Sequence, residues 1–162
     1  MNGRTLALII GSIAFTIPAG ALAAHPSPSP LWNGTWHLNA SHSRISSPGG
    51  KTSDTRTYRV IGNKVTLKST GTNALGEPLQ FTYSAAYDGK WYPMVGNPVG
   101  DSIAVTLVNP RRANARVKLH GTPSATSTVA VSTDGKHLTL TRRTLHAKST
   151  PTVDVLEYDK AK

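Results

Sequence analysis

The chain has 162 residues, with 18 lysines and arginines against 8 aspartates and glutamates, and a net charge of +10. This length is enough for one domain with a substantial core, and the charge either favours anionic partners or simply keeps the protein soluble. The sequence holds no cysteine, which excludes a disulfide scaffold, a thiol nucleophile, a zinc–thiolate site and a lipoprotein anchor.

The N-terminal segment has the organisation of a secretory signal peptide. Arg4 supplies a positive start, residues 6–17 are mostly apolar, and Ala21-Leu22-Ala23 has the small-x-small pattern of a signal-peptidase site. The apolar run is too short for a membrane span. We therefore expect residues 1–23 to be cleaved and the mature protein to be periplasmic or secreted. Export without cysteine favours a bacterial protein.

A short linker is expected to precede the folded domain. Residues 24–31 contain alternating prolines and serines, which favour an extended chain. From residue 32 to residue 160, no segment keeps the apolar period of a helix. Thr, Val and Ser are frequent there, and Gly, Pro, Asn and Asp interrupt the chain at short intervals, which is typical of an all-β domain.

The pattern predicts about ten short antiparallel strands. Gly62-Asn63, Asp88-Gly89 and Asp134-Gly135 are favourable hairpin turns. The clearest alternation of apolar and polar residues runs through residues 79–86. The expected strands are residues 35–39, 54–61, 64–70, 79–86, 90–92, 102–108, 113–119, 126–132, 136–143 and 152–158.

Closure of these strands into one barrel is the architecture that we expect. Each strand has one apolar and one polar face, and no helix is available to cover a flat sheet. A single antiparallel up-and-down β-barrel buries the apolar face and removes both edges. A two-sheet sandwich is the alternative. We do not expect an integral membrane protein, because the strands average about seven polar-rich residues, and a spanning strand needs roughly 9–11.

Four segments resemble a known family. Their sequences are WNGTWHLN at 32–39, YDGKWYPMVGNP at 87–98, VSTDGKHLTLT at 131–141 and VLEYDK at 155–160. The first is similar to the Gly-x-Trp opening of lipocalins. Together, and in this order, the four resemble a family of small exported bacterial lipocalin-like proteins, most of them uncharacterised. The resemblance implies a lipocalin-like barrel over residues 32–160 and brings little established chemistry with it.

The lipocalin resemblance also implies how one end of the barrel is closed. The tryptophan of Gly-x-Trp is here Trp36, two residues after Gly34, and it packs across the closed end near an arginine from a late strand. Arg142 and Arg143 are the matching arginines. The alternation around Leu138 predicts that Arg142 faces the lumen and Arg143 the outside.

Five aromatic residues are the candidate ligand-binding side chains. Inward aromatics in a small barrel either line an apolar cavity with a few hydroxyl groups or fill a solid core. Small inward residues such as Ala85, Ala113, Ala115 and Ala130 leave room and favour a cavity. The candidates are Tyr58, Phe81, Tyr83, Trp91 and Tyr92.

A basic stripe is expected on the outside of the barrel, from Arg111, Arg112, Arg116 and Lys118. The last three share one parity and should face solvent together. This stripe either docks on an anionic envelope component or is an ordinary solvated face. Nucleic acid is not an expected partner of an exported protein.

The sequence shows no signature of catalysis. It has no recognisable metal-ligand spacing, nucleophile–histidine–acid set, glycine-rich phosphate loop or carboxylate pair. We therefore expect a non-enzyme without cofactor or metal. The leading interpretation is an exported protein that binds or carries a small, largely apolar molecule in the barrel lumen. The alternative is an envelope-interaction module whose basic face contacts anionic polysaccharide or lipid, with no ligand in the lumen.

Overall fold

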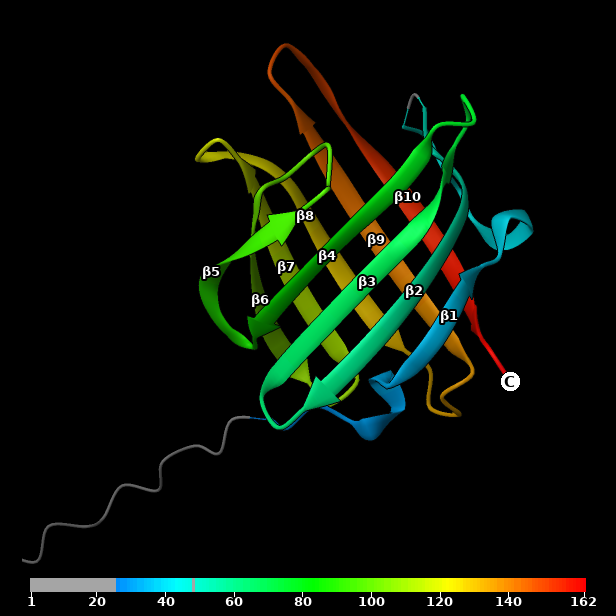
Figure 1. The fold of residues 1–162 in the computed structure, drawn as a ribbon, viewed down its shortest axis with the longest axis vertical. Helices are drawn as coiled ribbons and strands as arrows, with labels where there is room; N and C mark the ends of the chain where they lie inside the picture. The colour runs from blue at the N-terminus through cyan, green and yellow to red at the C-terminus, as the bar shows by residue number, and fades with distance from the viewer. Residues whose placement is uncertain (1–25, 48) are drawn as a thin grey trace, which may run out of the picture.

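The computed structural model describes residues 26–47 and 49–162, and within them ten antiparallel strands form one closed barrel (Figure 1). The predicted signal peptide, residues 1–23, lies outside the described residues. The strands are β1 (Gly34–Leu38), β2 (Lys51–Ile61), β3 (Lys64–Asn73), β4 (Pro78–Ala86), β5 (Asp88–Val95), β6 (Ser102–Asn109), β7 (Arg112–Leu119), β8 (Thr122–Val131), β9 (His137–His146) and β10 (Ser149–Lys160).

The strands follow one another around the ring in chain order, and β1 pairs with β10 to close it. Trp36 of β1 lies opposite Arg56 of β2 on one side and Lys160 of β10 on the other. This arrangement confirms the predicted up-and-down barrel and excludes the two-sheet sandwich. The barrel forms because alternating side chains give every strand one face that only closure can bury.

Every predicted strand overlaps an observed one, but several observed strands are longer. β2 begins at Lys51 instead of residue 54, because a register shift between Lys51 and Ser53 interrupts the alternation that marks a strand. β5 continues through Pro93, which reads in sequence as a strand end. Pairing between β5 and β4 is limited to Thr82 with Val95 and Tyr83 with Met94, so this part of β5 is nearly an edge strand and accommodates proline.

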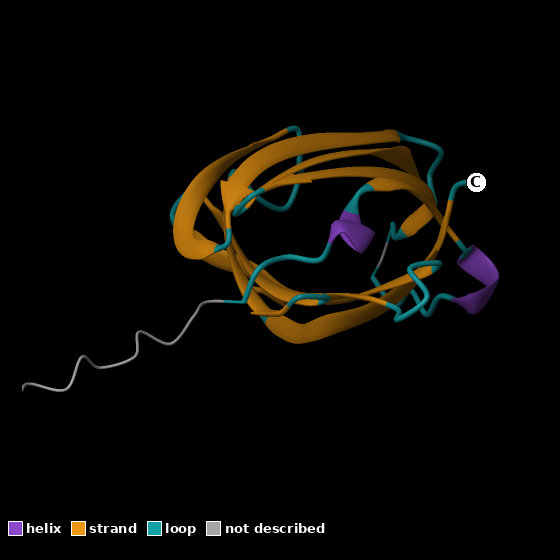
Figure 2. Ribbon diagram, turned by 90° about the horizontal axis from the view of Figure 1, so that it is seen from below, coloured by secondary structure: helices purple, strands orange, loops and turns teal. Residues whose placement is uncertain are grey.

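One end of the barrel is closed by a short 3₁₀ helix, η1 (Pro30–Trp32), which lies within the ring of strands in Figure 2. Ser29 accepts a hydrogen bond from the Leu31 N–H, and its own N–H donates to the Pro110 carbonyl at 2.7 Å. Trp32 is buried, and its indole N–H donates to the same Pro110 carbonyl at 2.8 Å. A second 3₁₀ helix, η2 (Ala40–His42), follows β1.

Candidate functional site: the barrel lumen

A cavity of about 720 Å³ lies inside the barrel. Its mouth is at the end opposite η1, where Glu77, Gly96, Pro98 and His146 are exposed lining residues. The volume falls within the range of roughly 300–1,000 Å³ that is common for small-molecule sites. The lumen is therefore open rather than filled.

One wall of the cavity is apolar. It comes mainly from β5 to β9, whose inward positions alternate with exposed polar ones. Small side chains among them, Ala115 and Ala125, leave the space that larger residues would fill. The apolar residues of this wall are Met94, Ile103, Ala115, Val117, Ala125, Val129 and Leu140.

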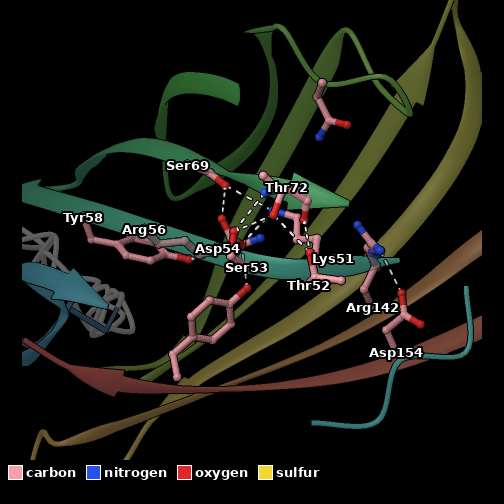
Figure 3. A network of polar contacts seen from close by, with 12 residues as sticks. Lys51, Thr52, Ser53, Asp54, Arg56, Tyr58, Ser69, Thr72, Arg142 and Asp154 are labelled. Atoms are coloured by element: carbon pink, nitrogen blue, oxygen red, sulfur yellow. Dashed lines mark hydrogen bonds and ion pairs between the residues drawn. The ribbon is translucent and has the colours of Figure 1, made fainter. Parts of the chain in front are cut away.

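The opposite wall carries a buried ionic network around Asp54, which we call the Asp54 cluster (Lys51, Asp54, Arg56, Ser69 and Tyr158). Figure 3 labels four of its members: Lys51, Asp54, Arg56 and Ser69. The Asp54 carboxylate accepts hydrogen bonds from Lys51 Nζ at 2.6 Å, Arg56 Nε at 2.9 Å, the Ser69 hydroxyl at 2.6 Å and the Tyr158 hydroxyl at 2.7 Å. All five side chains are buried, so these charges interact with little screening by water.

Burial and charge act in opposite directions within the Asp54 cluster. Burial alone would raise the pKa of Asp54, but the charges of Arg56 and Lys51, with the hydrogen bonds they donate, hold that pKa well below its usual range. Burial and the positive charge of Arg56 lower the pKa of Lys51 to about 8, although the charge of Asp54 and its hydrogen bond act in the opposite direction. Asp54 is therefore ionised, and Lys51 loses its proton more readily than an exposed lysine does.

A second ion pair, Arg142 with Asp154, lies on β9 and β10. Arg142 Nη2 donates to Asp154 Oδ2 at 2.7 Å. Asp154 also accepts from the Ser46 N–H at 2.8 Å, the Ser47 N–H at 3.0 Å and the Ser47 hydroxyl at 2.7 Å. These bonds tie the loop before β2 to β10, and with the guanidinium they outweigh burial and lower the pKa of Asp154. Arg142 Nε is buried and has no hydrogen-bond partner among the described residues.

The two ion pairs present their cations to the cavity. Lys51, Arg56 and Arg142 line it, whereas Asp54 and Asp154 are not among its lining residues. The one carboxylate on the described lining is Glu77, which is exposed at the mouth and accepts a hydrogen bond from Asn73. The cavity thus combines an apolar wall with a cationic one.

Three of the five aromatic candidates line this cavity: Tyr58, Phe81 and Tyr83. Trp91 and Tyr92 do not. Trp91 has the outward parity of β5 and is 38% exposed, with Lys118 Nζ at 4.1 Å and the Arg116 guanidinium at 5.2 Å from its ring centroid. Tyr92 packs against the core but donates its hydroxyl to Asp88 at 3.0 Å, outside the cavity lining. Ligand contact by the three lining residues stays a prediction.

At the closed end of the barrel, the cation beside Trp36 is Lys160 and not one of the two expected arginines. Trp36 is fully buried, and its indole N–H donates to the Trp32 carbonyl at 3.2 Å. Lys160 Nζ lies 5.0 Å from the centroid of the Trp36 ring and also donates to the Leu31 carbonyl. The expectation of Arg142 or Arg143 beside Trp36 is therefore corrected.

The register explains this correction. Lys160 lies directly opposite Trp36, whereas Arg142 pairs with Asp154 nearer the open end. Arg142 does face the lumen and Arg143 is exposed, as predicted from the alternation around Leu138. Gly34 adopts φ +129°, and a Cβ there would lie 2.8 Å from Lys160 Cε, so this glycine gives the lysine room.

The predicted basic stripe is present in part. Arg112 and Arg116 are exposed and Lys118 is half-buried on the outer face of β7. Arg111 lies in the turn before β7 and donates to the Thr133 hydroxyl at 2.8 Å. It therefore belongs to the closed end rather than to the stripe.

The Asp54 cluster and Asp154 are not among the predicted site residues. Asp54, Arg56 and Tyr58 share one parity of β2, so the alternation already placed two charged groups beside a predicted inward tyrosine. The sequence pattern gives less indication that Lys51 and Asp154 belong to this site. Lys51 precedes the register shift in β2, and the partners of Asp154 come from a loop far away in sequence.

A second pocket, of about 670 Å³, lies at the closed end. Its walls include residues 26–30, Asn33, Val60 and Tyr87, and it shares no lining residue with the lumen cavity. Across the residues that the structure describes, no group of three or more His, Cys, Asp or Glu side chains is placed to hold a metal ion. Within the same residues, no helix is long and apolar enough to cross a membrane.

Two solved structures are similar to this chain. The chain resembles zebrafish ileal bile acid-binding protein complexed with cholic acid, with a TM-score of 0.54 and 16% identity over 81% of this chain and 99% of that one. It also resembles EF1p2_mFAP2b bound to DFHBI, with a TM-score of 0.46 and 9% identity over 81% of this chain and 94% of that one. No family model and no curated protein matches the sequence. The first similarity supports the lipocalin-like barrel fold.

Proposed function

We propose that this protein binds a small, largely apolar molecule in the lumen of its barrel and is not an enzyme. The observation that carries the proposal is the cavity of about 720 Å³ with an apolar wall from β5 to β9. Burial of an apolar ligand against that wall supplies the free energy of binding, at roughly 25 cal/mol per Å² of apolar surface. The similarity to a barrel that was solved with cholic acid is consistent with this role.

The proposal is tested by titrating a neutral fluorescent probe such as Nile red. We expect saturable binding of one probe per chain. Ala115→Leu fills the apolar wall and should weaken binding by about tenfold or more, the equivalent of about 1.4 kcal/mol. Asn114→Leu adds the same side chain to the neighbouring, exposed position of β7 and should leave binding unchanged. Equal binding by both variants would place the probe outside the lumen and contradict the proposal.

We propose a second candidate function for the outer face of β7, in docking on an anionic envelope polysaccharide or lipid. Its support is the row of Arg112, Arg116 and Lys118 on this face, where Arg116 and Lys118 also lie against the exposed Trp91 ring. Binding to such a surface should collapse as salt rises, because exposed charges are screened within about 8–10 Å. Reversal of these three basic residues to glutamate should abolish association with anionic vesicles. Unchanged association would eliminate this candidate.

We further propose export to the bacterial periplasm or medium, with cleavage after residue 23 on the pattern of Ala21-Leu22-Ala23. Intact-mass measurement of the protein from periplasm and medium should show a chain that lacks residues 1–23. A full-length chain found only in the cytoplasmic fraction would contradict export.

A further inference from the structure

We infer that the ligand of the lumen is an anionic amphiphile, whose oxyanion head lies against Arg142, Arg56 and Lys51 and whose apolar body lies against the wall of Met94, Ile103 and Val117. This inference rests on the proposed function and adds the chemical class of the ligand. A carboxylate, sulfate or phosphate ester head would meet the same requirement. Four observations lead to it.

The first observation is which members of the two ion pairs line the cavity. Asp54 and Asp154 have fully buried side chains and are not among the lining residues. Lys51, Arg56 and Arg142 all line it. A molecule in the lumen therefore meets ammonium and guanidinium groups first. In a site with little water, oriented charges of this kind select strongly for the opposite charge.

The second observation is an excess of positive charge along the cavity wall. Lys51 and Arg56 are buried and Arg142 is partly buried, and these three cations are matched by two buried carboxylates, because Glu77 is exposed at the mouth and hydrogen-bonded to Asn73. Uncompensated buried charge is unfavourable unless a partner is supplied. Burial and the charges of Arg56 and Arg142 lower the pKa of Lys51 to about 8, which is the expected response to this excess. An anionic ligand supplies the missing counter-charge.

The third observation is the state of Arg142. Asp154 already accepts three hydrogen bonds from Ser46 and Ser47, so Arg142 is not the only donor to that carboxylate. Its Nε is buried and has no partner within residues 26–47 and 49–162, although a guanidinium usually directs several donors at acceptors. An oxygen from a ligand head would satisfy this donor after a small movement of the side chain.

The fourth observation is the separation of the two walls. The cations come from β2 and β9, and the apolar residues most distant from them in the ring come from β5, β6 and β7. Lys51 and Arg56 also lie 5.3 Å and 5.7 Å from the centroid of the Phe81 ring, which joins the charged wall to the apolar one. A ligand with a charged end and an apolar body matches both walls, whereas a neutral apolar molecule leaves the cations without a partner.

The test compares two probes with the same body, dansylaminoundecanoic acid and its methyl ester, by fluorescence titration of the full protein below their aggregation limits. The acid should bind at least about tenfold more tightly than the ester. Arg142→Gln should reduce this preference to about threefold or less. Arg143→Gln removes the neighbouring, exposed arginine of β9 and should keep the full preference.

A second variant keeps the inference falsifiable if Arg142→Gln does not fold. Lys51→Met leaves Asp54 with donors from Arg56, Ser69 and Tyr158, and should lower the preference for the acid in the same way. Equal binding of acid and ester by the unaltered protein would overturn this inference and leave the proposed function standing. No binding of acid, ester or Nile red would overturn both. A preference that survives in Arg142→Gln and Lys51→Met alike would also overturn the assignment of these residues.

Discussion

At the scale of single residues, Asp54 organises the charged wall of the lumen. Its carboxylate joins a lysine, an arginine, a serine and a tyrosine that come from three strands. Such a buried network is favourable only while every charge is paired, because removal of one partner leaves the others uncompensated. The network therefore holds Lys51 and Arg56 at the lumen wall. It also makes the stability of the fold depend on the Asp54 side chain.

Asp54→Asn should be strongly destabilising. The substitution leaves Lys51 and Arg56 buried without their carboxylate, which should cost about 3–5 kcal/mol in the free energy of unfolding. Urea denaturation followed by tryptophan fluorescence measures this change. Asp134→Asn, in the exposed turn between β8 and β9, is the control and should stay within about 0.5 kcal/mol. Equal stability of the two variants would show that the Asp54 cluster does not hold the barrel together.

The stability of the protein should fall in acid. Both Asp54 and Asp154 have pKa values below that of a free aspartate, about 3.9, so the folded state binds their protons less readily than the unfolded state. Their contribution is complete above the free value and is lost as the pH falls through the lower folded pKa values. Urea midpoints measured from about pH 6 to pH 2 should show this loss. The loss should be smaller in Asp54→Asn, and an identical pH profile would contradict the assignment.

At the scale of elements, β2 and β3 approach each other closely near the start of β2, where the Lys51 side chain lines the lumen. The register shift between Lys51 and Ser53 lies beside Gly71, and an added Cβ at Gly71 would lie 2.1 Å from the Ser53 carbonyl oxygen. The Ser53 backbone could make room for such a Cβ only by displacing the bulge in β2. Gly71 is therefore the residue that lets the two strands approach.

Gly71→Ala should displace β2 at the bulge and destabilise the protein by about 1–3 kcal/mol, the usual cost of overpacking. It should also weaken binding of the acid probe more than that of its ester, because Lys51 moves with the bulge. Lys68→Ala, at a solvent-facing position of the same strand, should change neither quantity. Thermal unfolding and the paired titration test both statements, and wild-type values for Gly71→Ala would refute them.

Element by element, the sequence predicted the fold better than the site. Alternation located all ten strands and turned Arg142 inward and Arg143 outward, because side-chain direction follows residue number within a strand. It could not show that Lys160 lies over Trp36, since that contact depends on the pairing of the first and last strands. The prediction of Trp91 as a ligand-binding residue rests on its aromatic ring. Its parity on β5 turns that ring outward beside Lys118.

At the scale of the whole molecule, the protein separates two kinds of positive charge. Arg112 and Arg116 lie on the outer face, where salt screens them, and Lys51, Arg56 and Arg142 line the lumen, where it screens them far less. The outer charges favour solubility or docking on an anionic surface. In the proposal above, the inner charges pair with the anionic head of a ligand. Ligand binding in the lumen should therefore depend on salt much less than any association of the outer face.

The central claim is that the barrel takes one small molecule into its lumen, and native mass spectrometry of the full protein tests it most directly. The protein should be incubated with a panel of apolar and amphiphilic compounds, beside the Ala115→Leu variant. We predict a saturating adduct of one ligand per chain, strongest for anionic amphiphiles and reduced in the variant. A bare protein mass across the whole panel, or adducts of equal intensity in Ala115→Leu, would contradict the claim.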